Sequence, residues 1–163
     1  MSNLLKKKIK MGKWFLYNFA VAFTFYCTGN IILWFPWSIN ENFGIAMMLS
    51  VMPLFWAVGM YLCLVRYNGK KLLTGCILTA LIMVVSSILL DCIFFGLIRE
   101  AWNDLYKPTT FYGYGFLVAL PFVEFFLFKK MILRKTRNIL TKEFIPLGIV
   151  SLISIIIQTI ILT

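Results

Sequence analysis

The stretch LLTGCILTALIMVVSSILLDCIFFGLI, from Leu72 to Ile98, decides which class of fold this chain can adopt. Asp91 is its single charged residue. An α-helix rises 1.5 Å per residue, so about 20 apolar residues cross the roughly 30 Å of hydrocarbon in a lipid bilayer. The stretch therefore predicts a transmembrane helix, with its spanning part over residues 72–95.

Four further windows predict membrane spans on the same ground. Residues 14–40, 42–65 and 144–163 carry no charge, and residues 108–128 carry only Glu124. The composition agrees, because 61% of the 163 residues are hydrophobic and 13% are charged, whereas soluble domains have about 25% charged residues. We therefore predict an all-α integral membrane protein, a compact single-domain bundle over residues 1–163 with five spans at about 14–36, 43–65, 72–95, 109–128 and 144–163.

The basic segment before residue 14 is similar to the start of a signal peptide. However, the apolar run that follows exceeds the 7 to 15 residues of such a signal. The first window is therefore predicted to stay as a helix.

Basic residues mark one side of the predicted bundle. The chain carries a net charge of +10, and its Lys and Arg residues gather before the first span, between the second and third, and between the fourth and fifth. Short basic loops stay in the cytoplasm, which predicts a cytoplasmic N-terminus and, after five spans, an outer C-terminus. Because the charges are split among apolar runs, anionic lipid headgroups are the expected partner and nucleic acid is not.

The last of these basic regions, residues 129–143, predicts a short amphipathic helix lying on the inner surface. Apolar residues such as Ile132 and Ile139 fall on one side and basic residues on the other. Topology and lipid anchoring are sufficient to explain it. Docking of an acidic cytoplasmic partner is the alternative.

Aromatic residues gather on the predicted outer face. Amphipathic rings at headgroup depth form an interfacial belt in many membrane proteins. The other interpretation is a binding platform, with Glu41, Glu100 and Asp104 nearby, suited to a cationic peptide or a sugar headgroup. The rim consists of Trp34, Trp37, Trp102, Tyr106 and Tyr112.

Small and polar residues indicate which helix faces pack against protein, since helices in lipid associate through such residues. In the last span they recur at intervals of 3, 3 and 4 residues, which makes one helical stripe. A comparable position, Asn18, lies in the first span. We expect these residues to form a packing or partner interface: Gly148, Ser151, Ser154 and Gln158, with Asn18.

Two acidic residues lie within the spans and are candidates for ion or ligand binding. Asp91 lies about 28 Å along its helix from Leu72, and Glu124 about 6 Å from the inner end of the fourth span. The two acids are thus near opposite surfaces, which argues against a carboxylate dyad. They fit one acid at each end of a polar path.

Structural roles are the alternative for both acids. Asp91 can accept a hydrogen bond from Ser87, one turn earlier, or pair with Arg99. Glu124 can pair with Lys129, Lys130 or Arg134. Pro121, three residues before Glu124, removes a backbone donor and predicts a kink that frees a carbonyl for a polar site.

Several reactive groups are missing from the sequence. It contains no histidine, and its four cysteines occur singly, so neither a Ser-His triad nor a zinc site is expected. No phosphate-binding loop is present, and we predict no cofactor and no metal.

Three functions follow, in order of preference. The first is a small non-enzymatic plasma-membrane protein, of accessory, immunity or envelope-stress type, that binds a larger membrane protein, a lipid or a peptide. The second is a small oligomeric cation- or proton-coupled transporter or channel that uses Asp91 and Glu124. The third is an acid-based intramembrane enzyme that uses Asp91 and Asp104. The Ile, Phe and Lys bias resembles small multispanning proteins of low-GC Gram-positive bacteria, which predicts a bacterial cell membrane.

Overall fold

The first two helices are separated by a single residue. In the computed structural model, which describes residues 3–162, α1 (Asn3–Ile39) ends before Asn40, and α2 (Glu41–Val65) begins after it. The backbone of Asn40 is extended, and its side chain accepts a hydrogen bond from the Phe43 N–H at 2.7 Å. This N-cap satisfies one of the free donors at the start of α2 and fixes the reversal of the chain. Thr163, the predicted end of the last span, lies outside the described residues.

The third helix changes its winding at Asp91. The α-helix α3 (Leu72–Asp91) continues into a π-helical segment, η1 (Cys92–Ile98). Glu100, with a φ of 51°, then turns the chain into a short 3₁₀ helix, η2 (Trp102–Tyr106). Because π-helical segments are wider than α-helices and are frequent at functional sites, this change marks the surroundings of Asp91 for closer inspection.

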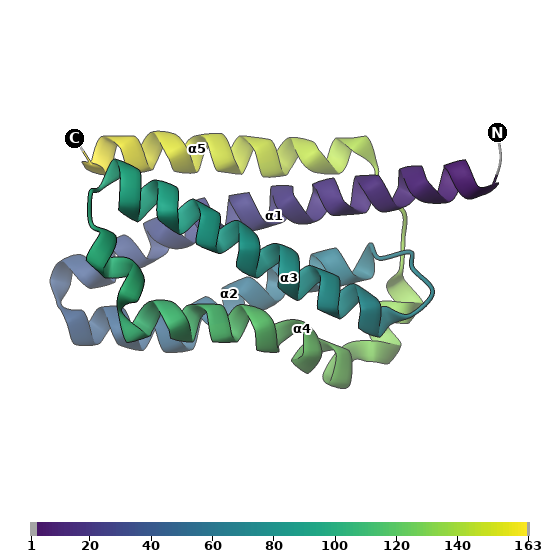
Figure 1. Cartoon of the computed structure of the whole chain (residues 1–163), viewed down its shortest axis with the longest axis horizontal. Coiled ribbons are helices and arrows are strands. Elements are labelled where there is room, and N and C mark those ends of the chain that lie inside the picture. Colours follow the sequence, from purple (N-terminus) through teal and green to yellow (C-terminus); the bar gives the residue numbers. More distant parts are fainter. Residues whose placement is uncertain (1–2, 163) are drawn as a thin grey trace.

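Four helices form a ring. α1 packs against α2 and α3, while α4 (Pro108–Lys135) packs against the same two helices from the opposite corner. α5 (Phe144–Leu162) lies outside this ring, along α1 (Figure 1). The N- and C-termini are at opposite ends of the bundle in Figure 1.

The two larger groups of buried apolar side chains lie inside the ring. One, which we call the basic-end core, includes Trp14, Leu64 and Ile132. The other, the middle core, includes Val21, Met60, Met83 and Leu117. Each group joins α1 to α4 across the ring, so the two diagonal helices are held together by side-chain packing.

The outside of the bundle is also apolar. Leu54 is 71% exposed and Phe126 is 78% exposed, and many other large hydrophobic side chains are uncovered in the same way. Within residues 3–162, four helical segments are long and apolar enough to cross a membrane: Lys10–Ile39, Glu41–Val65, Leu72–Ile98 and Thr141–Ile161. The prediction of an all-helical bundle with helices that can span a membrane is thus confirmed, while the predicted span at residues 109–128 is not among these four.

Residues 129–143 differ from the prediction of a separate surface helix. α4 continues to Lys135, residues 136–140 are irregular, and η3 (Thr141–Glu143) is a single 3₁₀ turn. Glu143 forms an ion pair with Arg66 at the end of α2, and the Arg137 N–H donates to the Val65 carbonyl at 3.0 Å. These contacts tie the segment to α2, which the sequence pattern of the segment alone could not show.

Candidate functional site

A cavity of about 490 Å³ lies between α1, α2, η1 and α4, at the end of the bundle that carries the predicted aromatic rim. We call it the aromatic-end cavity. Its size falls within the range of small-molecule sites, which are mostly apolar with a few placed polar groups. The side chains that give it this character are Trp34, Trp37, Met52, Trp56, Phe94 and Leu117.

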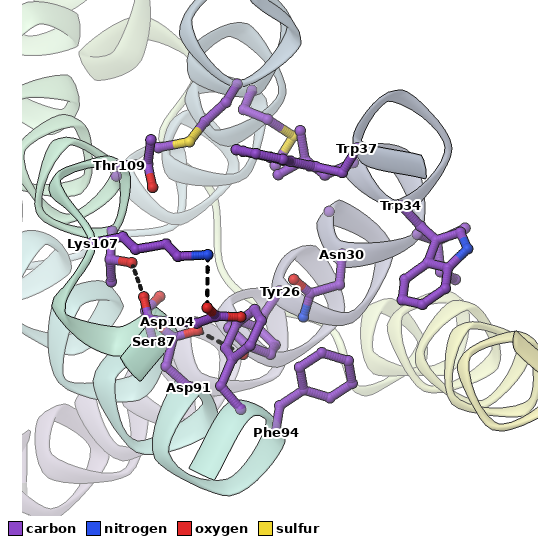
Figure 2. A pocket seen from close by; sticks show the side chains of 18 of the residues that line it. Tyr26, Asn30, Trp34, Trp37, Ser87, Asp91, Phe94, Asp104, Lys107 and Thr109 are labelled. Atoms are coloured by element: carbon purple, nitrogen blue, oxygen red, sulfur yellow. Dashed lines mark hydrogen bonds and ion pairs between the residues drawn. The ribbon is translucent and has the colours of Figure 1, made fainter. Parts of the chain in front are cut away.

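Asp91 is the buried acidic group of the cavity, whose lining also includes Asp104. The Tyr26 hydroxyl on α1 donates to its Oδ1 at 2.7 Å (Figure 2). The Tyr114 hydroxyl on α4 donates to its Oδ2 at 2.5 Å. Three helices therefore meet at one carboxyl group, which is itself buried. Both oxygens are engaged, so Asp91 fixes the geometry of the cavity wall.

These partners differ from the two that were expected. Ser87 lines the same cavity, but the hydrogen bonds to Asp91 come from the tyrosines. Arg99 stacks on aromatic rings instead, with its guanidinium 5.7 Å from the Trp34 ring centroid and 5.5 Å from that of Phe95. A helical repeat places Ser87 near Asp91 but says nothing about groups on other helices.

Arg99 and Asn30 are donor groups in the cavity lining. In the described part of the chain, the exposed Arg99 has no carboxylate within ion-pair distance, and Asp104 pairs with Lys107 at 2.7 Å. The side-chain nitrogen of Asn30 is buried without a hydrogen-bond partner, although it lies beside Tyr26. The cavity thus offers donors to a bound molecule while its own carboxylates are occupied.

The aromatic rim divides into two groups. Trp34 and Trp37 line the cavity. Trp102 lies against Gly96, where an added Cβ would come within 2.7 Å of the indole, and is half exposed. Tyr106 and Tyr112 are exposed, as belt residues are.

Glu124 does not belong to this cavity. It is buried on α4, ten residues after Tyr114, which is about 15 Å along the helix. The expected ion pairs with Lys129, Lys130 or Arg134 are absent among the described residues. Lys129 lies over the Phe125 ring instead. Pro121 is buried within α4, which changes direction along its length in Figure 1.

The polar stripe of α5 faces α1. Ser151 bonds to Thr24 at 2.8 Å, Ser154 bonds to Thr28 at 3.1 Å, and Gln158 donates to the Cys27 carbonyl at 2.7 Å. Gly148, the remaining member of the expected stripe, is exposed, and an added Cβ would meet nothing within 4 Å. The stripe thus holds α5 on the bundle.

Asn18 is fully buried in α1, and its amide nitrogen donates to the Trp14 carbonyl at 2.9 Å. Tyr26, Asn30 and Tyr114 were not predicted as site residues. All three lie in apolar runs of the sequence, and a tyrosine in such a run is usually interpreted as a residue at the membrane interface. Tyr26 and Asn30 do lie four residues apart on one face of α1, and that spacing was the available signal.

The described residues contain no cluster of three or more potential metal ligands. Comparison with protein families, with curated proteins and with solved structures finds no match. What the site can do must therefore be argued from its geometry.

Proposed function

We propose that this chain is a small non-enzymatic protein of the cell membrane that binds an anionic, lipid-like amphiphile in the aromatic-end cavity. The observation that carries the proposal is the pairing of an apolar wall with two donor groups, the exposed guanidinium of Arg99 and the buried, unpartnered amide nitrogen of Asn30. A guanidinium suits phosphate and carboxylate oxygens because its N–H groups form a planar fork. A long apolar chain would cover the tryptophan and methionine side chains below.

The topology that we propose has five spans, with the N-terminus in the cytoplasm. Residues 111–128 of α4 carry Glu124 as their single charge, and α4 packs against two of the segments already identified, α2 and α3. The positions of the two termini at opposite ends of the bundle support an odd number of crossings. The positive-inside rule then places the aromatic-end cavity toward the outer leaflet.

A shared path through Asp91 and Glu124, as a transporter would need, has less support. The buried middle core lies between the two acids, and Asp91 is held by two tyrosines. An acid pair for catalysis also has less support. Asp91 and Asp104 both line the cavity, but each has its own partners and neither shares a proton with the other.

Binding can be tested by native mass spectrometry of the full chain in mild detergent. We expect phosphatidylglycerol to remain bound in a one-to-one complex and phosphatidylcholine to bind more weakly. Gly113→Leu should block binding, because Gly113 lines the cavity. Gly115→Leu is the matched control on the same helix, since Gly115 is exposed with open space around it.

Arg99→Gln tests the headgroup contact. It should remove the preference for phosphatidylglycerol while leaving chain-dependent binding in place. Equal lipid retention by the wild type, Gly113→Leu and Gly115→Leu would contradict the proposal.

A further inference from the structure

The basic half of the bundle contains a second polar site, centred on Glu124. The residue is 3% exposed, and neither carboxyl oxygen has a hydrogen-bond partner among the described residues. The backbone of Tyr61 on α2 faces the carboxyl group without reaching hydrogen-bond geometry. A buried charge is strongly unfavourable unless something compensates it.

Two other helices contribute buried oxygen atoms without partners. They are Oδ1 of Asn18 on α1 and Oγ1 of Thr79 on α3, and both residues are 0% exposed. The amide nitrogen of Asn18 is already engaged by the Trp14 carbonyl. The end of Asn18 that lacks a partner is therefore the acceptor.

These groups lie in the same part of the ring. The Trp14 indole donates to the Cys63 carbonyl at 2.9 Å, which fixes this part of α1 against α2. Glu124 lies near both Cys63 and Cys76, and Thr79 follows Cys76 by about one turn.

Helix direction brings Thr79 and Glu124 to a similar depth. Along α3, Thr79 lies eight residues beyond Lys71, which is about 12 Å from the basic end. Along α4, Glu124 lies five residues before Lys129, which is about 7.5 Å from the same end. The Cα–Cβ bonds of a helix tilt toward its N-terminus. Since α3 and α4 run in opposite directions, the Thr79 side chain leans toward the basic end, and that of Glu124 leans away from it.

Apolar layers close the site on both sides. The middle core, with Met60 and Met83, separates it from the aromatic-end cavity. The basic-end core, with Leu64 and Ile132, covers it toward the basic loops. A group bound there would be occluded from both surfaces.

We propose that Glu124, Asn18 and Thr79 form an occluded site for one monovalent metal cation. The four unpartnered atoms of these three residues are oxygens, which are the ligands that hard cations take. A single carboxylate balances one positive charge, so a monovalent ion matches the site. This inference is independent of the amphiphile proposed above, because the two sites use different residues.

Sodium is the probe for the test. Thermal unfolding of the purified full chain is measured in NaCl and in choline chloride at equal ionic strength. Na⁺ should raise the unfolding temperature saturably, because it binds the folded state alone. The half-saturating Na⁺ concentration should fall as the pH rises, since protons compete for Glu124.

Three variants make the test specific. Glu124→Gln keeps the size of the side chain and should abolish the Na⁺ response. Thr79→Val should raise the half-saturating Na⁺ concentration roughly tenfold, because it removes one ligand. Asp104→Asn, at the opposite end of the bundle, should leave the response unchanged.

Two results would overturn the cation site. One is an equal unfolding temperature in NaCl and in choline chloride. If the unfolding temperature then changes with pH alone, the site binds a proton and not a metal cation. The other is a normal Na⁺ response in Glu124→Gln. If Glu124→Gln fails to fold, an unchanged half-saturating Na⁺ concentration in Thr79→Val also refutes the proposal.

Discussion

The hydrogen bonds from Tyr26 and Tyr114 to Asp91 should be a main source of interhelical stability at the aromatic end. The perturbation is Tyr26→Phe, Tyr114→Phe and the double variant. Each change removes one hydroxyl and keeps the ring, so packing of the ring against its neighbours is preserved. The bonds join α1 and α4 to α3, at 2.7 and 2.5 Å.

The expected cost follows from the type of bond. Interhelical hydrogen bonds in membrane proteins average about 0.6 kcal/mol, whereas bonds to charged groups contribute about 1.5 to 3 kcal/mol in proteins generally. Because the acceptor is a buried carboxyl group, we expect about 1 to 2 kcal/mol for each single variant. The double variant should cost more than the sum, since it leaves Asp91 with neither partner.

The measurement is reversible unfolding in mixed micelles with increasing SDS, followed by circular dichroism. Adding Asp91→Leu to the double variant should recover part of the loss, because it removes the unsatisfied acid. Single-variant costs below about 0.5 kcal/mol that add without coupling would refute this account of Asp91.

Three further outcomes can be measured. Glu143→Ala should lower the free energy of unfolding by about 3 kcal/mol, because it leaves Arg66, which is 4% exposed, without its ion-pair partner. Adding Arg66→Met to this variant should restore most of the lost stability. Gly148→Ala should stabilise α5 by about 0.5 to 1 kcal/mol, since its surroundings are open, whereas Gly44→Ala should destabilise the fold because its Cβ would overlap the Trp37 ring. A reporter enzyme fused after residue 163 should lie on the outer side of the membrane. Reporter activity in the cytoplasm would contradict five spans.

The sequence allowed the helical segments to be predicted closely, because hydrophobic run length is a local property. The predicted span at residues 43–65 lies within Glu41–Val65, and the predicted span at residues 72–95 lies within Leu72–Ile98. Prediction was weaker where local winding changes. Nothing in CIFFGLI indicates that Cys92–Ile98 is π-helical, since both helix types accept the same apolar residues.

The candidate site was predictable only in part. Asp91 and Glu124 stand out in any reading of the chain, because acids in apolar runs are rare. Their partners do not stand out. The bonds of Asp91 cross 65 residues to Tyr26 and 23 to Tyr114, and such pairings depend on how α1 and α4 are rotated against α3.

By itself the sequence determined the helical class, the approximate helix boundaries and the separation of the basic and aromatic ends. These properties follow from residue type and from distance along one helix. Only the tertiary structure decided that Asp91 is held by two tyrosines, that a cavity lies beside it, and that Glu124 is enclosed with no hydrogen-bond partner among residues 3–162. The physical reason is that hydrogen bonding and burial depend on which faces of different helices meet, and helices in lipid can meet in many arrangements with similar hydrophobic patterns.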